Sequence, residues 1–280
     1  MNFTKLQGAG NDFVLVETDG KRLNWSKLAQ AMCHRHFGIG ADGLLLLSTT
    51  KDGLKMRMFN PDGSEAEACG NGLRCLVRYA LDKGVVDTKA TEISVETIAG
   101  IRKARLLTQG NKTIIQVGMG QPRFGAKEIP VTLETSLAEP ILDYPLTVGD
   151  RKLSLSFVSM GNPHAVCFVE QPVAEFPLAQ IGPKVEKHPM FPQRTNFEVA
   201  RVLGQGQLEA RVWERGAGET LACGSGACAI AVIARIAKMH NCNKFDIRLP
   251  GGMLSVEWDG KGEVRLSGPA EIVLSGEWPL

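Results

Sequence analysis

The chain has 280 residues, which allows one large domain or two of ordinary size. Hydrophobic residues make up 44% and charged residues 22%, the composition of a globular protein with a substantial core. The formal net charge of +2 comes with no basic cluster, so we expect neither nucleic acid nor a membrane surface as a partner. No apolar run reaches the length of a membrane span, and the first residues do not resemble a signal peptide. We therefore expect a cytoplasmic protein.

The first half begins with strand-like runs, starting at MNFTKLQ, and its clearest element is a helix over residues 71–83. Apolar residues recur there at helical spacing and form one face, and Gly84 supplies a stop signal. Three strand-like segments follow: ISVETIAG, IRKARLLT and KTIIQVGMG. A segment with several prolines, residues 122–147, is interpreted as the link into the second half.

The second half repeats this order, with strand-like runs before a helix over residues 225–239. That helix is apolar nearly all round, which predicts a buried helix surrounded by sheet. The segments FDIRLPGG, MLSVEW and EVRLSG after it are predicted strands.

Seven cysteines are present, and an odd count in a long chain argues against a disulfide framework. There is no Cys-x-x-Cys pair, and the histidines do not stand at metal-ligand spacing; His34 and His36, for example, are two residues apart. We expect no metal site. Most of these thiols are expected to be buried as small hydrophobic side chains.

Two glycine-rich segments resemble each other and indicate an internal duplication. FNPDGSEAEACGNGLRC ends at Cys75 and WERGAGETLACGSGAC ends at Cys228, and both contain Ala-Cys-Gly-(Asn/Ser)-Gly. Their cysteines, Cys69 and Cys223, lie 154 residues apart, and Glu65 matches Glu219 at the same offset. A shared offset for separate matches predicts two similar halves related by pseudo-symmetry.

Cys69 and Cys223 each stand where a helix is expected to begin. The backbone N–H groups of a helix N-terminus are unsatisfied and carry partial positive charge, so they can bind a carboxylate. The same environment is expected to lower the pKa of a thiol and make thiolate available. Two thiols facing one substrate could remove an α-proton from one side and return a proton from the other, which inverts the stereocentre.

Alternatives remain open from these residues alone. The pair could belong to a racemase or isomerase for another amino acid, or to a thiol redox sensor that cycles between dithiol and disulfide. A lone Cys-Gly-x-Gly is more often a structural turn, and two copies at matched positions favour function.

With these motifs, the sequence resembles the diaminopimelate epimerase family. The matching segments follow the family's order along nearly the whole chain: GAGNDF (8–13), GIGADG (38–43), FNPDGSEAEACGNGLRC (59–75), MGNPHAV (160–166), RTNFEV (194–199) and WERGAGETLACGSGA (213–227). The resemblance implies an α/β fold of the α+β type, with two pseudo-symmetric domains. Each would be a mostly antiparallel, barrel-like sheet around a central helix, with the active site in the cleft between them. We expect domains at 1–121, joined by a C-terminal strand at 268–280, and at 122–267.

The resemblance also implies the activity, which is interconversion of LL- and meso-diaminopimelate on the route to lysine and peptidoglycan. Cys69 and Cys223 would be the acid–base pair, and His164 and Glu214 would tune the thiols. The residues expected to bind the substrate are Asn11, Asn60, Gly70, Asn71, Asn162, Asn196, Glu214, Arg215, Gly224 and Ser225. No lysine stands in a recognisable pyridoxal-phosphate motif, so no cofactor is expected, and the family suggests a homodimer.

One position departs from the family pattern. Many family members carry Gln where this chain has Gly43, and that Gln reaches the substrate. Gly43 can offer at most a backbone contact.

Overall fold

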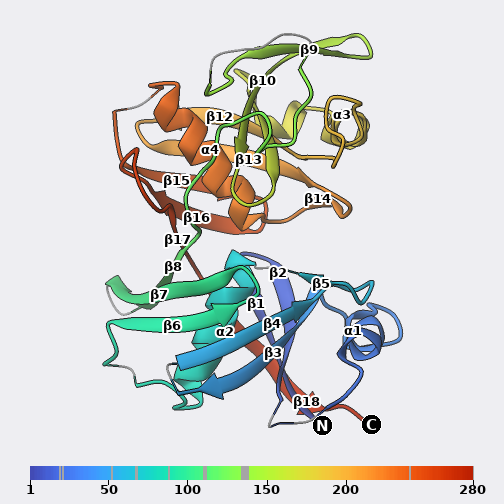
Figure 1. Ribbon diagram of the computed structural model, residues 1–280, viewed down its shortest axis with the longest axis vertical. Coiled ribbons are helices and arrows are strands. Elements are labelled where there is room, and N and C mark those ends of the chain that lie inside the picture. The colour runs from blue at the N-terminus through green and yellow to red at the C-terminus, as the bar shows by residue number, and fades with distance from the viewer. Residues whose placement is uncertain are drawn as a thin grey trace. The chain divides into compact units, whose positions relative to one another are not determined.

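The computed structural model describes residues 1–18, 20, 22–51, 53–66, 69–87, 89–109, 112–133, 139–239 and 241–279. Contacts divide the chain into unit 1, Met1–Gly118 with Ser267–Leu280, and unit 2, Met119–Leu266. Figure 1 labels the helices and strands of each unit. Whether residues 1–121 and 122–267 act as separate domains remains a prediction.

Unit 1 consists mainly of strands around one helix. Its elements are β1 (Asn2–Gly8), β2 (Asn11–Glu17), α1 (Trp25–Cys33), β3 (Gly43–Thr50), β4 (Gly53–Phe59), β5 (Glu65–Ala66), α2 (Gly70–Asp82), β6 (Glu92–Thr97), β7 (Gly100–Gln109), β8 (Lys112–Gly118) and β18 (Glu271–Glu277). Antiparallel pairs join β18 to β1, β1 to β2, β3 to β4, β6 to β7 and β7 to β8. Two parallel pairs, β2 with β3 and β4 with β6, are the crossovers that contain α1 and α2.

Unit 2 has the same order of elements. They are β9 (Tyr144–Val148), β10 (Arg151–Ser159), β11 (Pro163–Phe168), η1 (Val173–Glu175), α3 (Leu178–Glu186), β12 (Asn196–Gly204), β13 (Gln207–Glu214), β14 (Gly218–Thr220), α4 (Gly224–Ile236), β15 (Lys244–Leu249), β16 (Gly252–Glu257) and β17 (Arg265–Gly268), the last of which crosses into unit 1. The pairs β10–β11, β12–β13 and β15–β16 are antiparallel, whereas β11–β12 and β13–β15 are parallel. The parallel crossovers contain α3 and α4, as those of unit 1 contain α1 and α2.

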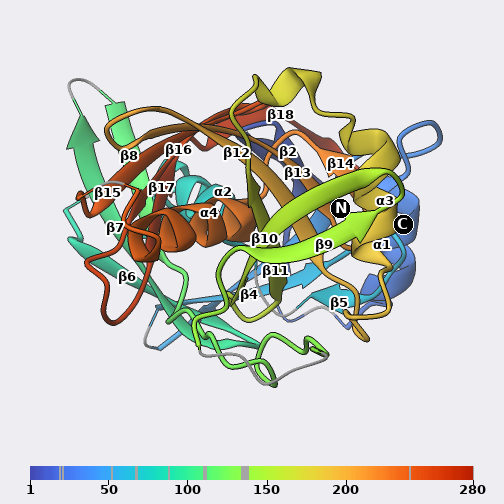
Figure 2. The same cartoon turned by 90° about the horizontal axis from the view of Figure 1, so that it is seen from above.

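A central helix lies inside the strands of each unit. α2 contacts β1, β2, β3, β4, β8 and β18, and α4 contacts β10, β11, β12, β15 and β16. Figure 2 shows α4 among the unit 2 strands. All but three residues of α4 are buried, in keeping with its apolar sequence. The mixed fold, with mostly antiparallel strands around a central helix, is therefore confirmed.

Smaller helices cover the outer face of each set of strands. α1 packs its buried face, including Ala29 and Met32, on β2 and β3. α3 packs Leu178, Ile181 and Val185 against β12 and β13. Each of these helices therefore completes an apolar cluster in its unit.

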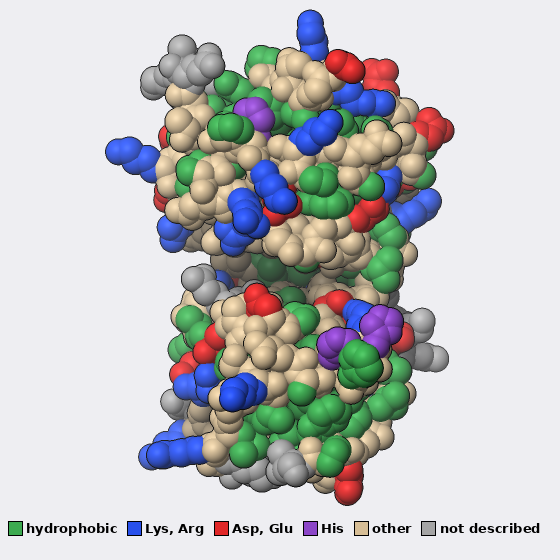
Figure 3. Space-filling view, turned by 90° about the vertical axis from the view of Figure 1, so that its right-hand side faces the viewer, with side chains coloured by type: hydrophobic (Ala, Val, Ile, Leu, Met, Phe, Trp, Pro, Cys, Tyr) green, Lys and Arg blue, Asp and Glu red, His purple; other side chains and the backbone are tan. Residues whose placement is uncertain are grey.

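The link segment differs in part from the expectation. Its last residues form β9, which pairs with β10 in unit 2, and residues 134–138 lie outside the described residues. Among the described residues, no helix is long and apolar enough to cross a membrane. On the face drawn in Figure 3, Lys and Arg side chains occur on both units with acidic and uncharged side chains among them.

Candidate active site

Cys69 is the N-cap of α2. Its backbone is extended (φ −141°, ψ 118°), and its Sγ accepts a hydrogen bond from the Gly72 backbone N–H at 3.4 Å. A Cβ on Gly72 would lie 3.1 Å from Leu45 Cδ2, so a larger residue there would require the Leu45 side chain to shift. The thiol therefore stands among the unsatisfied N–H groups of the first helical turn, as the Cys-Gly-Asn-Gly motif predicted.

Cys223 is the N-cap of α4 and repeats this geometry. Its backbone is also extended (φ −119°, ψ 116°), and Sγ accepts from the Gly226 N–H at 3.3 Å. The Ser225 hydroxyl lies 3.5 Å from the sulfur. Cys223 is buried, with 5% of its surface exposed, whereas Cys69 is partly exposed.

The pKa of Cys223 contradicts the sequence-based expectation. Burial and the neighbouring Glu214 carboxylate raise the pKa of this thiol well above its ordinary value, although Ser225 and the Gly226 N–H act to lower it. The helix N-terminus is present as predicted, but desolvation of a fully enclosed thiolate outweighs it. The resting form of Cys223 is therefore the thiol.

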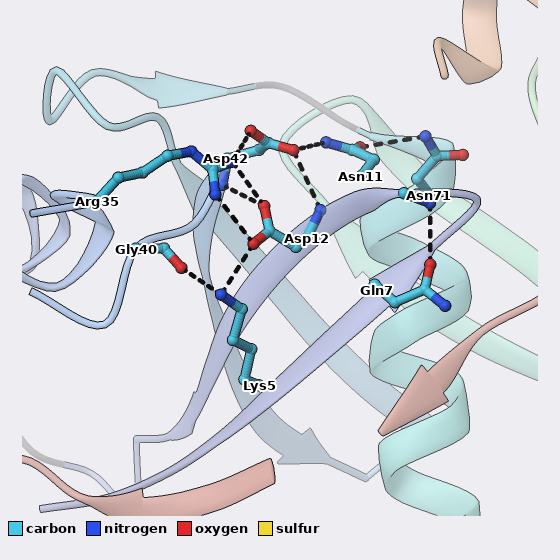
Figure 4. Close-up of polar contacts among 9 residues, drawn as sticks. Lys5, Gln7, Asn11, Asp12, Arg35, Gly40, Asp42 and Asn71 are labelled. Carbon is cyan, nitrogen blue, oxygen red and sulfur yellow. Dashed lines mark hydrogen bonds and ion pairs between the residues drawn. The ribbon is translucent and has the colours of Figure 1, made fainter. Parts of the chain in front are cut away.

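A polar chain fixes the amides beside Cys69 (Figure 4). Asn11 donates through Nδ2 to Asp42 Oδ2 at 2.7 Å and accepts at Oδ1 from Asn71 Nδ2 at 3.1 Å. Asn71 Oδ1 accepts in turn from Arg74 Nη2 at 2.9 Å. A carboxylate only accepts and a guanidinium only donates, so the two charged ends set the direction of both amides. Asn11 Oδ1 consequently faces the Cys69 sulfur, at 3.9 Å.

Charges behind Asp42 hold that end of the chain. Arg35 Nη2 lies 2.7 Å from Asp42 Oδ1 and 2.9 Å from Asp12 Oδ1, and Lys5 Nζ lies 2.9 Å from Asp12 Oδ2. Burial acts to raise the pKa of Asp12, but hydrogen bonds from Arg35 and Lys5 outweigh it and lower the pKa. Figure 4 shows these contacts meeting at the edge of β2. The network therefore favours the ionised form of the Asp12 carboxylate.

A different chain lies beside Cys223. His164 Nδ1 is 2.7 Å from Glu198 Oε1, and both side chains are fully buried. The other ring nitrogen, Nε2, is 2.9 Å from Asn162 Oδ1. Asn162 Nδ2 donates to Ser225 Oγ at 3.3 Å, and Ser225 in turn reaches the Cys223 sulfur.

Glu214 reaches Cys223 from the end of β13. It accepts a hydrogen bond from the thiol and another from Thr220 Oγ1 at 2.5 Å. Burial raises the pKa of Glu214, which Thr220 and Cys223 act to lower. A carboxylate with a raised pKa beside a thiol with a raised pKa can receive the thiol proton without separating charge.

Asn196 and Arg215 meet on the next strand edge. Asn196 Nδ2 donates to the Pro163 carbonyl at 2.8 Å, and its Oδ1 accepts from the Arg215 backbone N–H at 2.9 Å. The Arg215 side chain is exposed and donates to the Gln193 carbonyl at 3.3 Å. Asn196 therefore positions the backbone that presents Arg215.

Asn60 and Gly43 are the remaining positions singled out from the sequence. Among the described residues, the Asn60 side chain bonds within its own turn, donating from Nδ2 to Ser64 Oγ at 3.0 Å. A Cβ on Gly43 would lie 3.0 Å from Met58 Cε and 3.2 Å from the Phe59 carbonyl, so this strand position is tightly filled.

Three residues of these chains were not identified from the sequence: Asp42, Arg74 and Glu198. Glu198 had a usable signal, because a lone acid in the strand-like run NFEVA is unusual for a buried strand. Among the described residues, no group of three or more His, Cys, Asp or Glu side chains is arranged to hold a metal ion.

Comparison with known proteins identifies relatives over the full chain. The diaminopimelate epimerase family model matches residues 3–125 and 156–273. A diaminopimelate epimerase from Moorella thermoacetica is 45% identical over 285 residues, covering 100% of both chains. One from Pelotomaculum thermopropionicum is 46% identical over 284 residues, covering 100% of this chain and 99% of its own.

Among solved structures, a phenazine biosynthesis protein of the PhzF family from Bacillus anthracis has the same fold. Its TM-score is 0.70 at 16% identity, and the match covers 100% of this chain and 99% of that one. At this identity the likeness concerns the fold alone.

Proposed function

The chain belongs to the diaminopimelate epimerase family, and on that premise we propose that it interconverts LL- and meso-2,6-diaminopimelate with Cys69 and Cys223 as the two acid–base groups. The observation that carries the mechanism is the matched pair of N-caps, in which each sulfur accepts the N–H of a glycine three residues on. A duplicated scaffold has thus kept one thiol at the same point of each half, as inversion at carbon requires.

The proton transfers balance between the two sulfurs. One thiolate takes the α-proton, so the C–H bond breaks, an S–H bond forms, and the electron pair is delocalised into the substrate carboxylate. The opposite thiol then gives its proton to the other face of the α-carbon and becomes the thiolate. The two sulfurs have exchanged roles, and the reaction calls for no cofactor. It does require that both thiols reach one substrate.

Backbone N–H groups would bind the reacting carboxylate, and side chains would control the protonation of the thiols. The N–H groups of Gly70, Asn71, Gly224 and Ser225 would bind the reacting carboxylate and stabilise the charge that develops on it. Glu214 would accept the proton of Cys223, with which it shares a hydrogen bond, and His164 would act on the same thiol through its neighbours.

The distal amino-acid end needs fixed donors and acceptors. Asn11, Asn60, Asn162 and Asn196 offer amide groups, Glu214 an ammonium partner, and exposed Arg215 a forked carboxylate contact. The directed amide of Asn11 and the fixed backbone of Arg215 support this assignment.

Proton NMR in heavy water tests the proposal. With reduced protein and LL-diaminopimelate, the α-proton signal should disappear as the meso form grows, and Cys69→Ala and Cys223→Ala should each abolish this. Cys33→Ala and Cys167→Ala are matched controls that should remain active, since neither cysteine caps the start of a helix: Cys33 is the last residue of α1 and Cys167 lies within β11. An unchanged substrate spectrum with folded, reduced wild type would refute the proposal.

The family resemblance also supports a homodimer in the cytoplasm, without nucleic acid or membrane as a partner. Light scattering after size exclusion measures the oligomer directly, and a monomeric mass would remove that part of the proposal.

A further inference from the structure

The buried position of Glu198 is unfavourable for the stability of the fold. It is fully buried, its Oε1 lies 2.7 Å from His164 Nδ1, and its Oε2 has no hydrogen-bond partner among the described residues. A buried carboxyl group with one unsatisfied oxygen costs free energy, and a buried ion pair is often no more stable than a well-packed apolar pair. The presence of the Glu198–His164 pair therefore calls for an explanation other than stability of the fold.

Unit 1 shows that the fold does without this pair. In the parallel pairs β2–β3 and β11–β12, Phe13 occupies the register position of His164, and Leu45 occupies that of Glu198. Phe13 and Leu45 are themselves fully buried. The same backbone arrangement is thus stable with two apolar side chains.

The equivalent helix contacts support this correspondence. A Cβ on Gly72 of α2 would lie 3.1 Å from Leu45, and a Cβ on Gly226 of α4 would lie 3.0 Å from Glu198 Oε1. Each side chain lies beneath the first turn of the helix that carries the site cysteine. Only unit 2 has a polar group there, so the pair is a specialisation of the Cys223 half-site.

A continuous hydrogen-bond chain leads from Glu198 to the sulfur. It runs through His164, Asn162 and Ser225 to Cys223, with steps of 2.7, 2.9, 3.3 and 3.5 Å. Asn162 Oδ1 can only accept, so His164 Nε2 must carry a hydrogen. Asn162 then donates to Ser225, which leaves the serine hydroxyl hydrogen to point at the sulfur.

The proton shared by Glu198 and His164 keeps a hydrogen on His164 Nε2, so that Nε2 donates to Asn162 Oδ1. As an ion pair, the imidazolium carries hydrogens on both ring nitrogens; as a neutral pair, the carboxyl O–H donates to Nδ1 and Nε2 keeps its hydrogen. Loss of that proton would leave a neutral ring whose only hydrogen is drawn to Nδ1 by the carboxylate. Nε2 would then face Asn162 Oδ1 with a lone pair.

We propose that Glu198 is a positioning residue for the epimerase reaction: through His164 it fixes the direction of the chain that presents the Ser225 hydroxyl as a donor to Cys223 Sγ. The inference rests on the proposed function and extends it. Donation to sulfur favours the thiolate, which Cys223 must form in order to act as a base. Burial also acts to raise the pKa of Glu198, which keeps the shared proton in place.

A double-mutant cycle between Glu198→Leu and Ser225→Ala tests the chain, because hydrogen bonds through His164 and Asn162 link the two side chains. The readout is the rate of Cys223 alkylation by iodoacetamide, measured by mass spectrometry from pH 6 to 10, with Cys69 as internal reference. The titratable groups that face Cys223 are Glu214, Glu198 and His164.

The two possible roles of Glu198 have opposite signs in this assay. As a mere negative charge, Glu198 would raise the pKa of Cys223, and Glu198→Leu would speed alkylation by the same factor in either background. Through the chain, Glu198→Leu should slow alkylation about fivefold when Ser225 is present and not when it is replaced, because leucine leaves His164 Nδ1 without the group that holds the ring. Glu198→Gln is the conservative control: its amide N–H can donate to Nδ1 and keep the hydrogen on Nε2, so it should not slow alkylation. Effects that multiply within twofold overturn the proposal. Asp246→Asn, the same charge change outside the chain, should leave the Cys223 rate unchanged.

A second variant, which carries the apolar pair of unit 1, keeps the test valid if a single substitution destabilises the protein. His164→Phe with Glu198→Leu installs the apolar pair that the scaffold already accepts, so it should fold and still lose about fivefold in Cys223 alkylation. A folded protein with an unchanged rate overturns the proposal. Alkylation needs no substrate, so the outcomes separate: failure of wild type to epimerise refutes the proposed function, whereas active wild type with uncoupled variants refutes only the chain.

Discussion

The two half-sites share a backbone and differ in how they hold their polar groups. In unit 1, the amides beside Cys69 lie between two charged ends, Asp42 and Arg74, and the Asp42 end continues into ion pairs near the surface. In unit 2, the amide beside Cys223 lies between a serine and a buried histidine. The duplicated N-cap and its glycine stayed constant while the residues behind them diverged.

The hairpin positions diverged in the same way. Asn60 directly follows β4 and Glu214 is the last residue of the matching strand, β13. The partners of these strands, β5 and β14, pair in the same register. Asn60 bonds within its own turn, whereas Glu214 contacts the thiol. Glu214 therefore gives Cys223 a proton acceptor that the neutral amide at the matching position of unit 1 cannot provide, so a symmetric fold supports an asymmetric pair.

The largest expected effect comes from placing the unit 2 acid in unit 1. Leu45→Glu should lower the free energy of unfolding by about 3–5 kcal/mol, because the buried carboxylate would have Phe13 instead of histidine as its neighbour. Urea unfolding measures this, with Leu45→Met as a control expected to cost less than about 1.5 kcal/mol. A cost for Leu45→Glu near that of the control would mean that unit 1 tolerates the acid and that the comparison fails.

Replacing Glu214 of unit 2 should affect catalysis more than stability. Glu214→Gln should lower kcat/KM about 100-fold, since the amide cannot take the Cys223 proton. Glu219→Gln is the matched control in the same hairpin and should lose less than about fivefold. Equal losses in steady-state assays would assign Glu214 to the hairpin structure and not to the thiol.

The hairpin salt bridges should differ in strength although their geometry matches. Arg57 and Arg211 each form a forked pair with a glutamate, but Arg211 also donates to the carbonyls of Val173 and Phe176 at 2.9 Å. Arg211→Ala should cost about 2 kcal/mol and the more exposed Arg57→Ala less than about 1 kcal/mol, both measured by urea unfolding. Equal costs would show that the carbonyl contacts add nothing.

The smallest effect is an opposite response of the two units to pH. Asp12 has a lowered pKa, so its contribution is present above its unfolded value of 3.8 and is lost as acid protonates it. Glu198 and Glu214 have raised pKa values, so their contribution is present below the unfolded value of 4.5 and declines as the pH rises toward the folded values.

Hydrogen exchange, corrected for intrinsic rates, separates these responses by unit. Protection around β2 should fall on the order of tenfold toward pH 3, and protection around β12 should fall similarly as the pH rises above 4.5. Parallel loss of protection in both units at either extreme would contradict the assignment.

Much of this arrangement was predictable because local sequence encodes it. The Cys-Gly-x-Gly repeats indicated both N-caps, and the helix positions differ from α2 and α4 by one to three residues. The pKa direction of Cys223 was wrong, because the depth of a thiol inside a fold is not written in its neighbours along the chain. Glu198 was missed for a similar reason: its partner is a histidine about thirty residues away that reaches it only through the parallel pairing of β11 with β12.

The pairing of β1 with β18 has a consequence for synthesis. The N-terminal amine donates to the Trp278 carbonyl, and Asn2 lies opposite Glu277. Unit 2 is therefore inserted in the sequence of unit 1, and its strands emerge from the ribosome before the strand that completes unit 1. We expect unit 1, whose first strands are made before unit 2, to finish folding only once β18 has been made, with the edge of β1 open to other chains until then.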